Sequence, residues 1–183
     1  MVRRRKLYVL AAMAVLALGA AAYAVASPPD SGPVIPQTKH FHADLNGFQE
    51  TPSVSTQAFG TFDATLDGDT LHYVFHYEGL EGGNSLFAHV HFGTRYVAGG
   101  VSFFLCGGST KPTPCPNGTG DIEGDVSAAD VIGPNNQGIE PASFVEILRG
   151  MRAGEAYANI HTQRWPGGEI RGQINDKDQK TIS

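Results

Sequence analysis

The sequence predicts an all-β fold: a Greek-key-like antiparallel β-sandwich of about seven or eight strands with one short helix. Two observations predict it. Segments that alternate polar and apolar residues recur along the chain, as strands with one buried face do. Glycine accounts for 23 of 183 residues, which supplies the tight turns that connect short strands.

The N-terminal residues 1–26 have the pattern of an export signal. Four basic residues at 3–6 precede an apolar run over 7–26, which ends in an A-x-A-like site. We expect a signal peptide cleaved after Ala26. Because the run is 20 residues long, an uncleaved signal anchor is the alternative. In both cases the rest of the chain is predicted to be extracytoplasmic (secreted, periplasmic or on the cell surface), with membrane contact only through this segment.

The chain after Ala26 has 157 residues, which suits one domain with its own core. Residues 27–38 hold four prolines without periodicity and indicate an extended linker. We expect the domain over 39–175 and a polar tail over 176–183. Without the basic residues of the signal, the net charge of −5 becomes −9. An acidic domain without clustered Lys and Arg argues against nucleic-acid binding.

The first predicted strands form a hairpin and its neighbour. Residues 39–47 alternate, with Phe41, Ala43 and Leu45 inward. The runs 59–66 and 70–80 flank an Asp-Gly pair at 67–68, which is a strong hairpin signal. In the second run, one face is apolar or aromatic at Leu71, Tyr73, Phe75 and Tyr77, and the other carries His72, Val74 and His76.

Further strands are expected over 85–93, 99–107, 156–163 and 168–174. Between the second and third of these, Ser143 and Glu146 have capping-box spacing, and apolar residues follow at helical spacing up to Met151. We therefore expect one short helix that ends before Gly154. Residues 165–168 should turn the chain between the last two strands, after which Glu169 and Arg171 share one face as a possible register-setting pair.

The two cysteines, Cys106 and Cys115, bracket a short loop rich in glycine and proline. In an oxidising compartment such a pair most simply forms a disulfide that closes a hairpin. A thiolate metal site is the alternative, but the spacing fits no standard zinc motif.

Three histidines form the candidate functional site. His89 and His91 share one face of a strand, because successive side chains in a strand point to opposite faces. His161 lies in another alternating strand, on a face shared with Tyr157 and Asn159. Neutral imidazole suits copper and zinc, so the pattern predicts a three-imidazole site if the strands are neighbours. Alternatively, the rings lie on a polar sheet face and bond to Asn, Thr or water.

The other histidines are expected to be solvated. His40 and His42 form a second H-x-H near the start of the domain, and His72 and His76 are too far apart along one strand to share a site easily. If a fourth copper ligand exists, His42 or His72 is the predicted one.

Long stretches of the chain resemble the CHRD domain, named from chordin, a secreted antagonist of growth factors. They are LNGFQETPSVSTQAFGTFDATLDGDTLHYVFHYEGL, AHVHFG and LRGMRAGEAYANIHTQRWPGGEIRGQI. The resemblance covers about residues 39–175. It implies an extracytoplasmic β-sandwich and, for bacterial members, no settled activity.

The order of residues is also similar, more weakly, to that of copper–zinc superoxide dismutases. That likeness implies His89, His91 and His161 as copper ligands and Arg171 as an anion guide. The bridging histidine and the zinc-site cluster of those enzymes are missing here.

Three functions remain open from the sequence. The first is an exported binding module that holds copper through the three histidines. The second is a structural or protein-interaction module without metal, whose partner is another extracytoplasmic protein. The third is a redox enzyme of the dismutase type. No catalytic residue is predicted, because no serine has a nucleophile-elbow motif and no phosphate-binding glycine loop precedes a helix.

Overall fold

The computed structural model describes residues 39–175. The predicted signal segment, the linker and the tail lie outside the described residues. Within the part of the chain that is described, no helix is both long enough and apolar enough to cross a membrane.

Eight strands form one antiparallel sheet in the order β5-β4-β7-β8-β1-β2-β3-β6. They are β1 (His40–Asn46), β2 (Phe59–Asp67), β3 (Thr70–Glu78), β4 (Ser85–Phe92), β5 (Gly100–Cys106), β6 (Gly120–Val126), β7 (Ala156–Thr162) and β8 (Ile170–Gln173). A short 3-10 helix, η1 (Gly47–Gln49), follows β1, and two more, η2 (Ala128–Asp130) and η3 (Asn135–Gln137), follow β6. The one α-helix within residues 39–175 is α1 (Phe144–Ala153).

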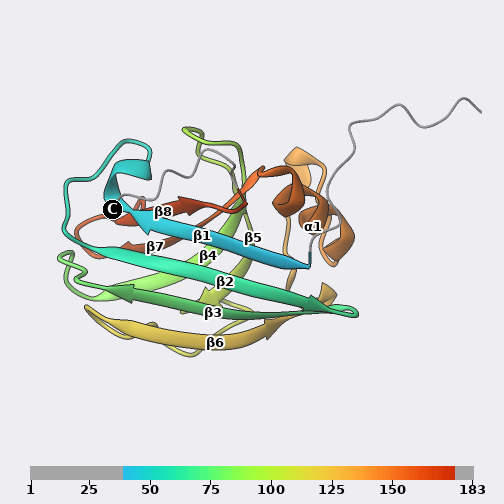
Figure 1. Ribbon diagram of the computed structural model, residues 1–183, viewed down its shortest axis with the longest axis horizontal. Helices are drawn as coiled ribbons and strands as arrows, with labels where there is room; N and C mark the ends of the chain where they lie inside the picture. The colour runs from blue at the N-terminus through green and yellow to red at the C-terminus, as the bar shows by residue number, and fades with distance from the viewer. Residues whose placement is uncertain (1–38, 176–183) are drawn as a thin grey trace, which may run out of the picture. The chain divides into compact units, whose positions relative to one another are not determined.

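The sheet curls until it is nearly a barrel. Figure 1 shows β1, β2, β3 and β6 in front of β4, β5 and β7, with α1 at one end. The edge strands β5 and β6 contact each other, and the Tyr73 hydroxyl of β3 donates a 2.8 Å hydrogen bond to the Leu105 carbonyl of β5. The prediction of an all-β antiparallel fold with one short helix is confirmed. Strands β1, β2, β3 and β6 form one wall of this near-barrel, and β4, β5, β7 and β8 form the other. Both walls belong to one continuous sheet.

Alternation decides which side chains fill the interior. The β2–β3 hairpin turns at Gly68, whose φ of +56° suits glycine. The expected inward face of β3, Leu71 to Tyr77, is buried, and the inward residues of β1 are buried against it. On the other wall Ala88 and Val90 of β4 face the same interior. Burial of this apolar surface is the main source of the domain's stability.

The helix and the disulfide are as predicted in position. α1 buries Phe144, Ile147, Leu148 and Met151, and Gly154 ends it in the left-handed conformation with φ of +77°. The Ser143 side chain makes no capping hydrogen bond, so the capping-box spacing marked the start of the helix without forming the box. Cys106 and Cys115 form a disulfide with a Cα–Cα distance of 5.3 Å.

Candidate metal centre

The three predicted histidines converge. β4 pairs with β7 in a register that sets His89 opposite Asn159 and Phe87 opposite His161. One ring nitrogen from each of His89, His91 and His161 lies within 4.8 Å of those of the other two. The ring centroid of His89 is 4.3 Å from that of His91 and 4.5 Å from that of His161. Nitrogens bound to one ion at ~2.0–2.1 Å are at most ~4.2 Å apart, so the three rings are near binding distance and small ring movements would complete the site.

The cluster lies on the outer side of the β4–β7–β8 wall and is nevertheless buried. His89, His91 and His161 are 3, 8 and 6% exposed. Two covering segments reach them through backbone carbonyls, of Gly99 in the β4–β5 loop and of Pro166 in the β7–β8 turn. The loop after η1 reaches β8 through a hydrogen bond between Arg171 and Thr51. These loops make a second, polar interior outside the barrel.

Backbone carbonyls set the tautomers of two rings. Nδ1 of His91 lies 2.8 Å from the Gly99 oxygen, and Nδ1 of His161 lies 2.8 Å from the Pro166 oxygen. Because a carbonyl oxygen only accepts, each Nδ1 carries the proton and each Nε2 keeps a lone pair. Among the described residues, the buried ring nitrogens without a partner are His89 Nδ1, His91 Nε2 and His161 Nε2.

The three rings are neutral at ordinary pH. Burial lowers the pKa of His89 to about 2, helped by the charges that the other two rings would carry. Burial also lowers the pKa of His91 to about 4, against the opposing effect of its hydrogen bond to Gly99. The pKa of His161 is lowered by burial as well. A metal needs the neutral imidazole, so no proton has to be displaced from these rings near pH 7.

Aromatic side chains fix the orientation of the rings. The Phe87 ring centroid lies 4.7 Å from that of His161 and 5.2 Å from that of His89. Tyr157 stacks on His91 with an interplanar angle of 10° and a centroid distance of 4.5 Å. These contacts limit ring rotation, which is what pre-organised ligands require.

Arg171 holds a loop in place. Its guanidinium lies 3.4 Å from the Tyr157 ring centroid and donates to the carbonyls of Thr94 and Val97, both at 3.1 Å. The residue is only 2% exposed. The anion guide that the dismutase likeness implies stays a prediction. In the structure, Arg171 secures the β4–β5 loop, whose Gly99 carbonyl orients His91.

The expected contact between Glu169 and Arg171 is replaced by separate partners. The Glu169 carboxylate accepts hydrogen bonds from the hydroxyls of Thr56 and Thr162, at 3.0 and 2.9 Å. It also accepts from the backbone N–H groups of Glu81 and Gly82. Glu169 therefore ties two loops to the wall that carries the histidines.

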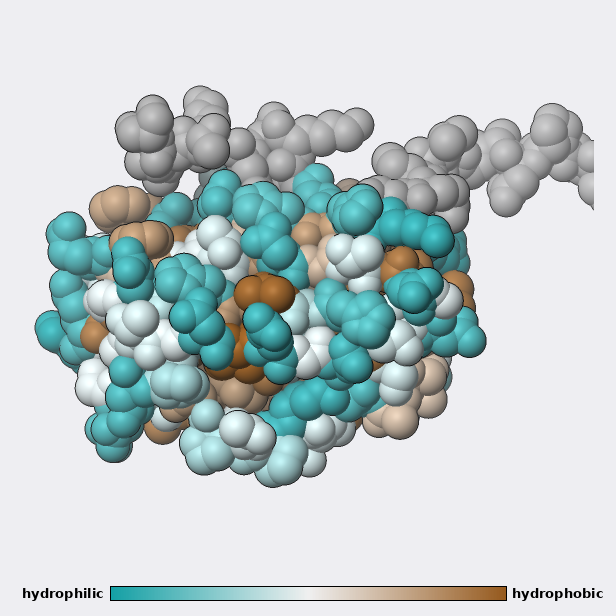
Figure 2. Space-filling model, turned by 60° about the horizontal axis from the view of Figure 1, so that its bottom comes forward, coloured by the Kyte–Doolittle hydropathy of each residue, from teal (hydrophilic) through white to brown (hydrophobic). Residues whose placement is uncertain are grey.

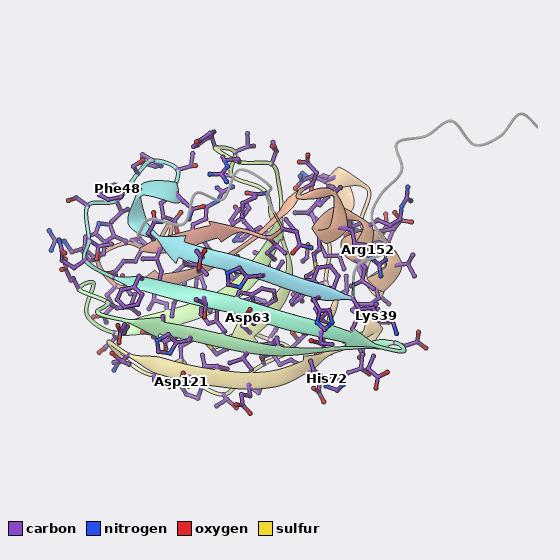
Figure 3. The ribbon with its side chains drawn as sticks, in the orientation of Figure 1. Lys39, Phe48, Asp63, His72, Asp121 and Arg152 are labelled. Carbon is purple, nitrogen blue, oxygen red and sulfur yellow. A yellow bond between two sulfur atoms is a disulfide. The ribbon has the colours of Figure 1, made fainter. Side chains whose placement is uncertain are left out.

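The structure places His42 and His72, the predicted candidates for a fourth ligand, away from the three-histidine cluster. Both side chains lie on the solvent-facing side of the β1–β2–β3–β6 wall and outside the cluster. His42 Nδ1 is 2.7 Å from an Asp63 oxygen, and His72 Nδ1 is 2.6 Å from an Asp125 oxygen. Figure 3 labels Asp63 and His72 on this wall, and Figure 2, in which the β6 side is turned forward, shows hydrophilic residues with smaller apolar patches between them. Alternation opposite the core places both side chains on the exposed face of their strands.

Two further residues belong to the surroundings of the site. Glu50 and Asn159 are both buried, and each has a side-chain oxygen without a partner, Oε1 and Oδ1 respectively. Gly168 makes room for them, since a Cβ there would lie 2.2 Å from Glu50 Oε1 and 2.9 Å from Asn159 Nδ2. Sequence reasoning placed Asn159 on the histidine face but missed Glu50, because an acidic residue in a turn is normally solvated.

A comparison with protein families identifies the chain. The family model of the CHRD domain matches residues 41–174, a stretch that contains all three histidines. The chain belongs to the CHRD-domain family. Neither the curated proteins nor the solved structures contain a match. Membership in the CHRD family indicates a binding or interaction module, and the family and the disulfide are consistent with an extracellular location.

Proposed function

We propose that this CHRD domain is an exported metal-binding module that holds copper through His89, His91 and His161. One observation carries the proposal: the three histidines bring ring nitrogens within 4.8 Å of one another, and each ring has one buried nitrogen without a hydrogen-bond partner among the described residues. With Nδ1 protonated in two of the rings, the nitrogens offered there are acceptors. Acceptors that converge in this way are suited to a cation.

The alternative is an interaction module whose histidines serve packing alone. Rings with that role normally pair both nitrogens with protein groups or water. Each buried polar atom left unpaired costs ~1–3 kcal/mol, so three in one place would be a costly arrangement for packing. A bound ion removes this cost, which favours the metal-binding function.

The ligand set favours copper among the common ions. Three neutral imidazoles suit copper and zinc rather than calcium or magnesium, which prefer oxygen. For the same nitrogen ligands, Cu²⁺ binds more tightly than Zn²⁺. The low exposure of the rings suits retention of an ion, for storage, delivery or sensing, better than turnover of a dissolved substrate.

The direct test is a copper titration of the purified protein in the presence of a competing chelator. We expect one tight site in the wild type and its loss in His89→Ala/His91→Ala. The matched control is His42→Ala/His72→Ala, which removes two histidines from the solvent-facing wall and should keep the tight site. Equal affinity in the wild type and in His89→Ala/His91→Ala would contradict the proposal.

A further inference from the structure

Glu50 differs from the other buried carboxylate among the described residues. Glu169, which is fully buried, receives four hydrogen bonds from hydroxyl and backbone donors. Glu50 is 5% exposed, and its Oε1 atom has no partner. A carboxylate held for structure alone resembles Glu169, so the incomplete bonding of Glu50 calls for a different role.

Asn159 connects Glu50 to the histidines. It lies opposite His89 in the β4–β7 pairing, and its side chain affects the pKa values of Glu50, His89 and His91. The lack of a side chain at Gly168 lets Glu50 Oε1 and Asn159 Nδ2 approach each other. Asn159 therefore separates Glu50 from the candidate ligands. From this position Glu50 acts on a bound ion through its charge and does not coordinate it.

A bound ion creates a charge problem that Glu50 can solve. The three ligands are neutral, and Arg171 already places one positive charge in the same interior. A second cation buried there without a compensating anion is unfavourable. We propose that Glu50 compensates the charge of the bound ion by releasing its proton when the ion enters, so that binding and deprotonation are coupled.

This inference rests on the proposed metal site. When the ion enters, the O–H bond of the Glu50 carboxyl group breaks, the proton passes to solvent, and the carboxylate remains. The buried charge then rises by +1 rather than +2 when Cu²⁺ enters.

The groups that face Glu50 leave it able to exchange a proton near neutral pH. Burial raises the pKa of Glu50 to about 7, against the opposing charge of Arg171 and hydrogen bonds from Thr51 and Asn159. The Tyr157 hydroxyl, whose own pKa is raised by burial, stays protonated in this range. Before the ion enters, Glu50 therefore holds its proton for much of the time at pH 7.

The pH dependence separates Glu50 from the ligands. With pKa values of about 2 and about 4, His89 and His91 are neutral above pH 6, so they release no protons there. Because the pKa of Glu50 is about 7, coupling to Glu50 predicts release of most of one proton per ion at pH 6 and much less at pH 8. Affinity should rise nearly tenfold per pH unit below 7 and level off near 8.

The experiment is calorimetric titration of the purified protein with Cu²⁺ in buffers of different ionisation enthalpy, at pH 6 and pH 8. Glu50→Gln keeps the size of the side chain but has no carboxyl proton. We expect it to release almost no proton at pH 6 and to bind more weakly than the wild type at pH 8. Glu123→Gln, on the solvent-facing side of β6, is the matched control and should behave as the wild type.

The outcomes distinguish the two proposals. If wild-type protein lacks the tight site, the proposed function fails and the role of Glu50 fails with it. If copper binds but no proton is released at pH 6, or if Glu50→Gln releases as many as the wild type, the role of Glu50 is overturned and the metal site stands. If Glu50→Gln does not fold, the absence of proton release from the wild type at pH 6 still overturns the role of Glu50.

Discussion

His161 donates a 2.8 Å hydrogen bond from Nδ1 to the backbone carbonyl of Pro166, five residues later. The bond makes the β7–β8 turn part of the candidate site, because it fixes the tautomer that leaves the His161 Nε2 lone pair available. The turn is closed by the Gly168 N–H, which donates to the Trp165 carbonyl at 3.0 Å. A substitution that changes the geometry of the β7–β8 turn should therefore also change the affinity for the metal.

Gly168→Ala tests this connection. Gly168 has a φ of +126°, and an added Cβ would lie 2.2 Å from Glu50 Oε1. We expect a loss of stability of ~1–3 kcal/mol, as for overpacked interior sites, together with weaker copper binding. Urea unfolding and copper titration measure the two effects.

Gly167→Ala is the matched control for that substitution. A Cβ at Gly167 meets no atom within 4 Å, so stability and affinity should stay near the wild-type values. If both alanine variants bound copper as the wild type does, the turn would have no part in the site.

Arg171→Lys should weaken copper binding without removing a ligand. A lysine has no planar fork with which to donate to the Thr94 and Val97 carbonyls together, so the β4–β5 loop should loosen. Because that loop supplies the Gly99 carbonyl to His91, we expect an affinity loss of about tenfold, typical of groups that orient ligands. Arg149→Lys, on the exposed face of α1, is the control for the competition titration. Unchanged copper affinity in Arg171→Lys would show that the β4–β5 loop does not support the site.

The metal-free protein should lose stability in mild acid. In the unfolded chain each histidine titrates near pH 6.5, whereas folded His89 and His91 have pKa values of about 2 and about 4. The unfolded state therefore binds protons first as the pH falls below 6.5. Each of these histidines lowers the free energy of unfolding by ~1.4 kcal/mol per pH unit as the pH falls from 6.5 to the pKa of the folded state.

Glu50 acts in the opposite direction. Its raised folded pKa stabilises the protein most below about pH 4.5, and this contribution is lost as the pH rises to about 7. The histidines outnumber it, so the free energy of unfolding should be lower at pH 5 than at pH 7.5. Urea unfolding at both values checks this, and His89→Gln/His91→Gln should lose most of the difference. Equal stability of the wild type at the two values would contradict the buried neutral state.

Much of the fold could be predicted from local patterns. Alternation located the buried face from Leu71 to Tyr77, the Asp-Gly pair located the hairpin, and the spacing around Ile147 located the helix. Each of these features depends on residues that are close in sequence. The closure of the sheet into a near-barrel depends on contacts between β5 and β6, which no local pattern encodes.

The candidate site could be predicted only in part. Both H-x-H pairs, at 40–42 and 89–91, point away from the barrel interior, and the sequence offers no periodic signal that separates them. The difference is that loops cover the second pair and leave the first in water. Loop packing also brings in Glu50 and the carbonyls of Gly99 and Pro166, which explains why the sequence indicated the histidine cluster but not its surroundings.

Removal of the disulfide should affect stability and leave the site intact. Cys106 and Cys115 close a short loop at the end of β5, away from the three ligands in the sequence. The chain-entropy model assigns such a loop ~2–3 kcal/mol. We expect Cys106→Ser/Cys115→Ser to melt at a lower temperature and to bind copper with wild-type affinity. Loss of the tight copper site in a folded Cys106→Ser/Cys115→Ser variant would show that the cysteines contribute to copper binding.

The most direct measurement is X-ray absorption at the copper edge of protein loaded with one equivalent of the ion. We expect three imidazole nitrogens at ~2.0 Å from the copper ion, and one imidazole fewer in His161→Ala. A first shell with fewer than three imidazoles in the wild type, or the same spectrum from His161→Ala, would contradict the three-histidine site.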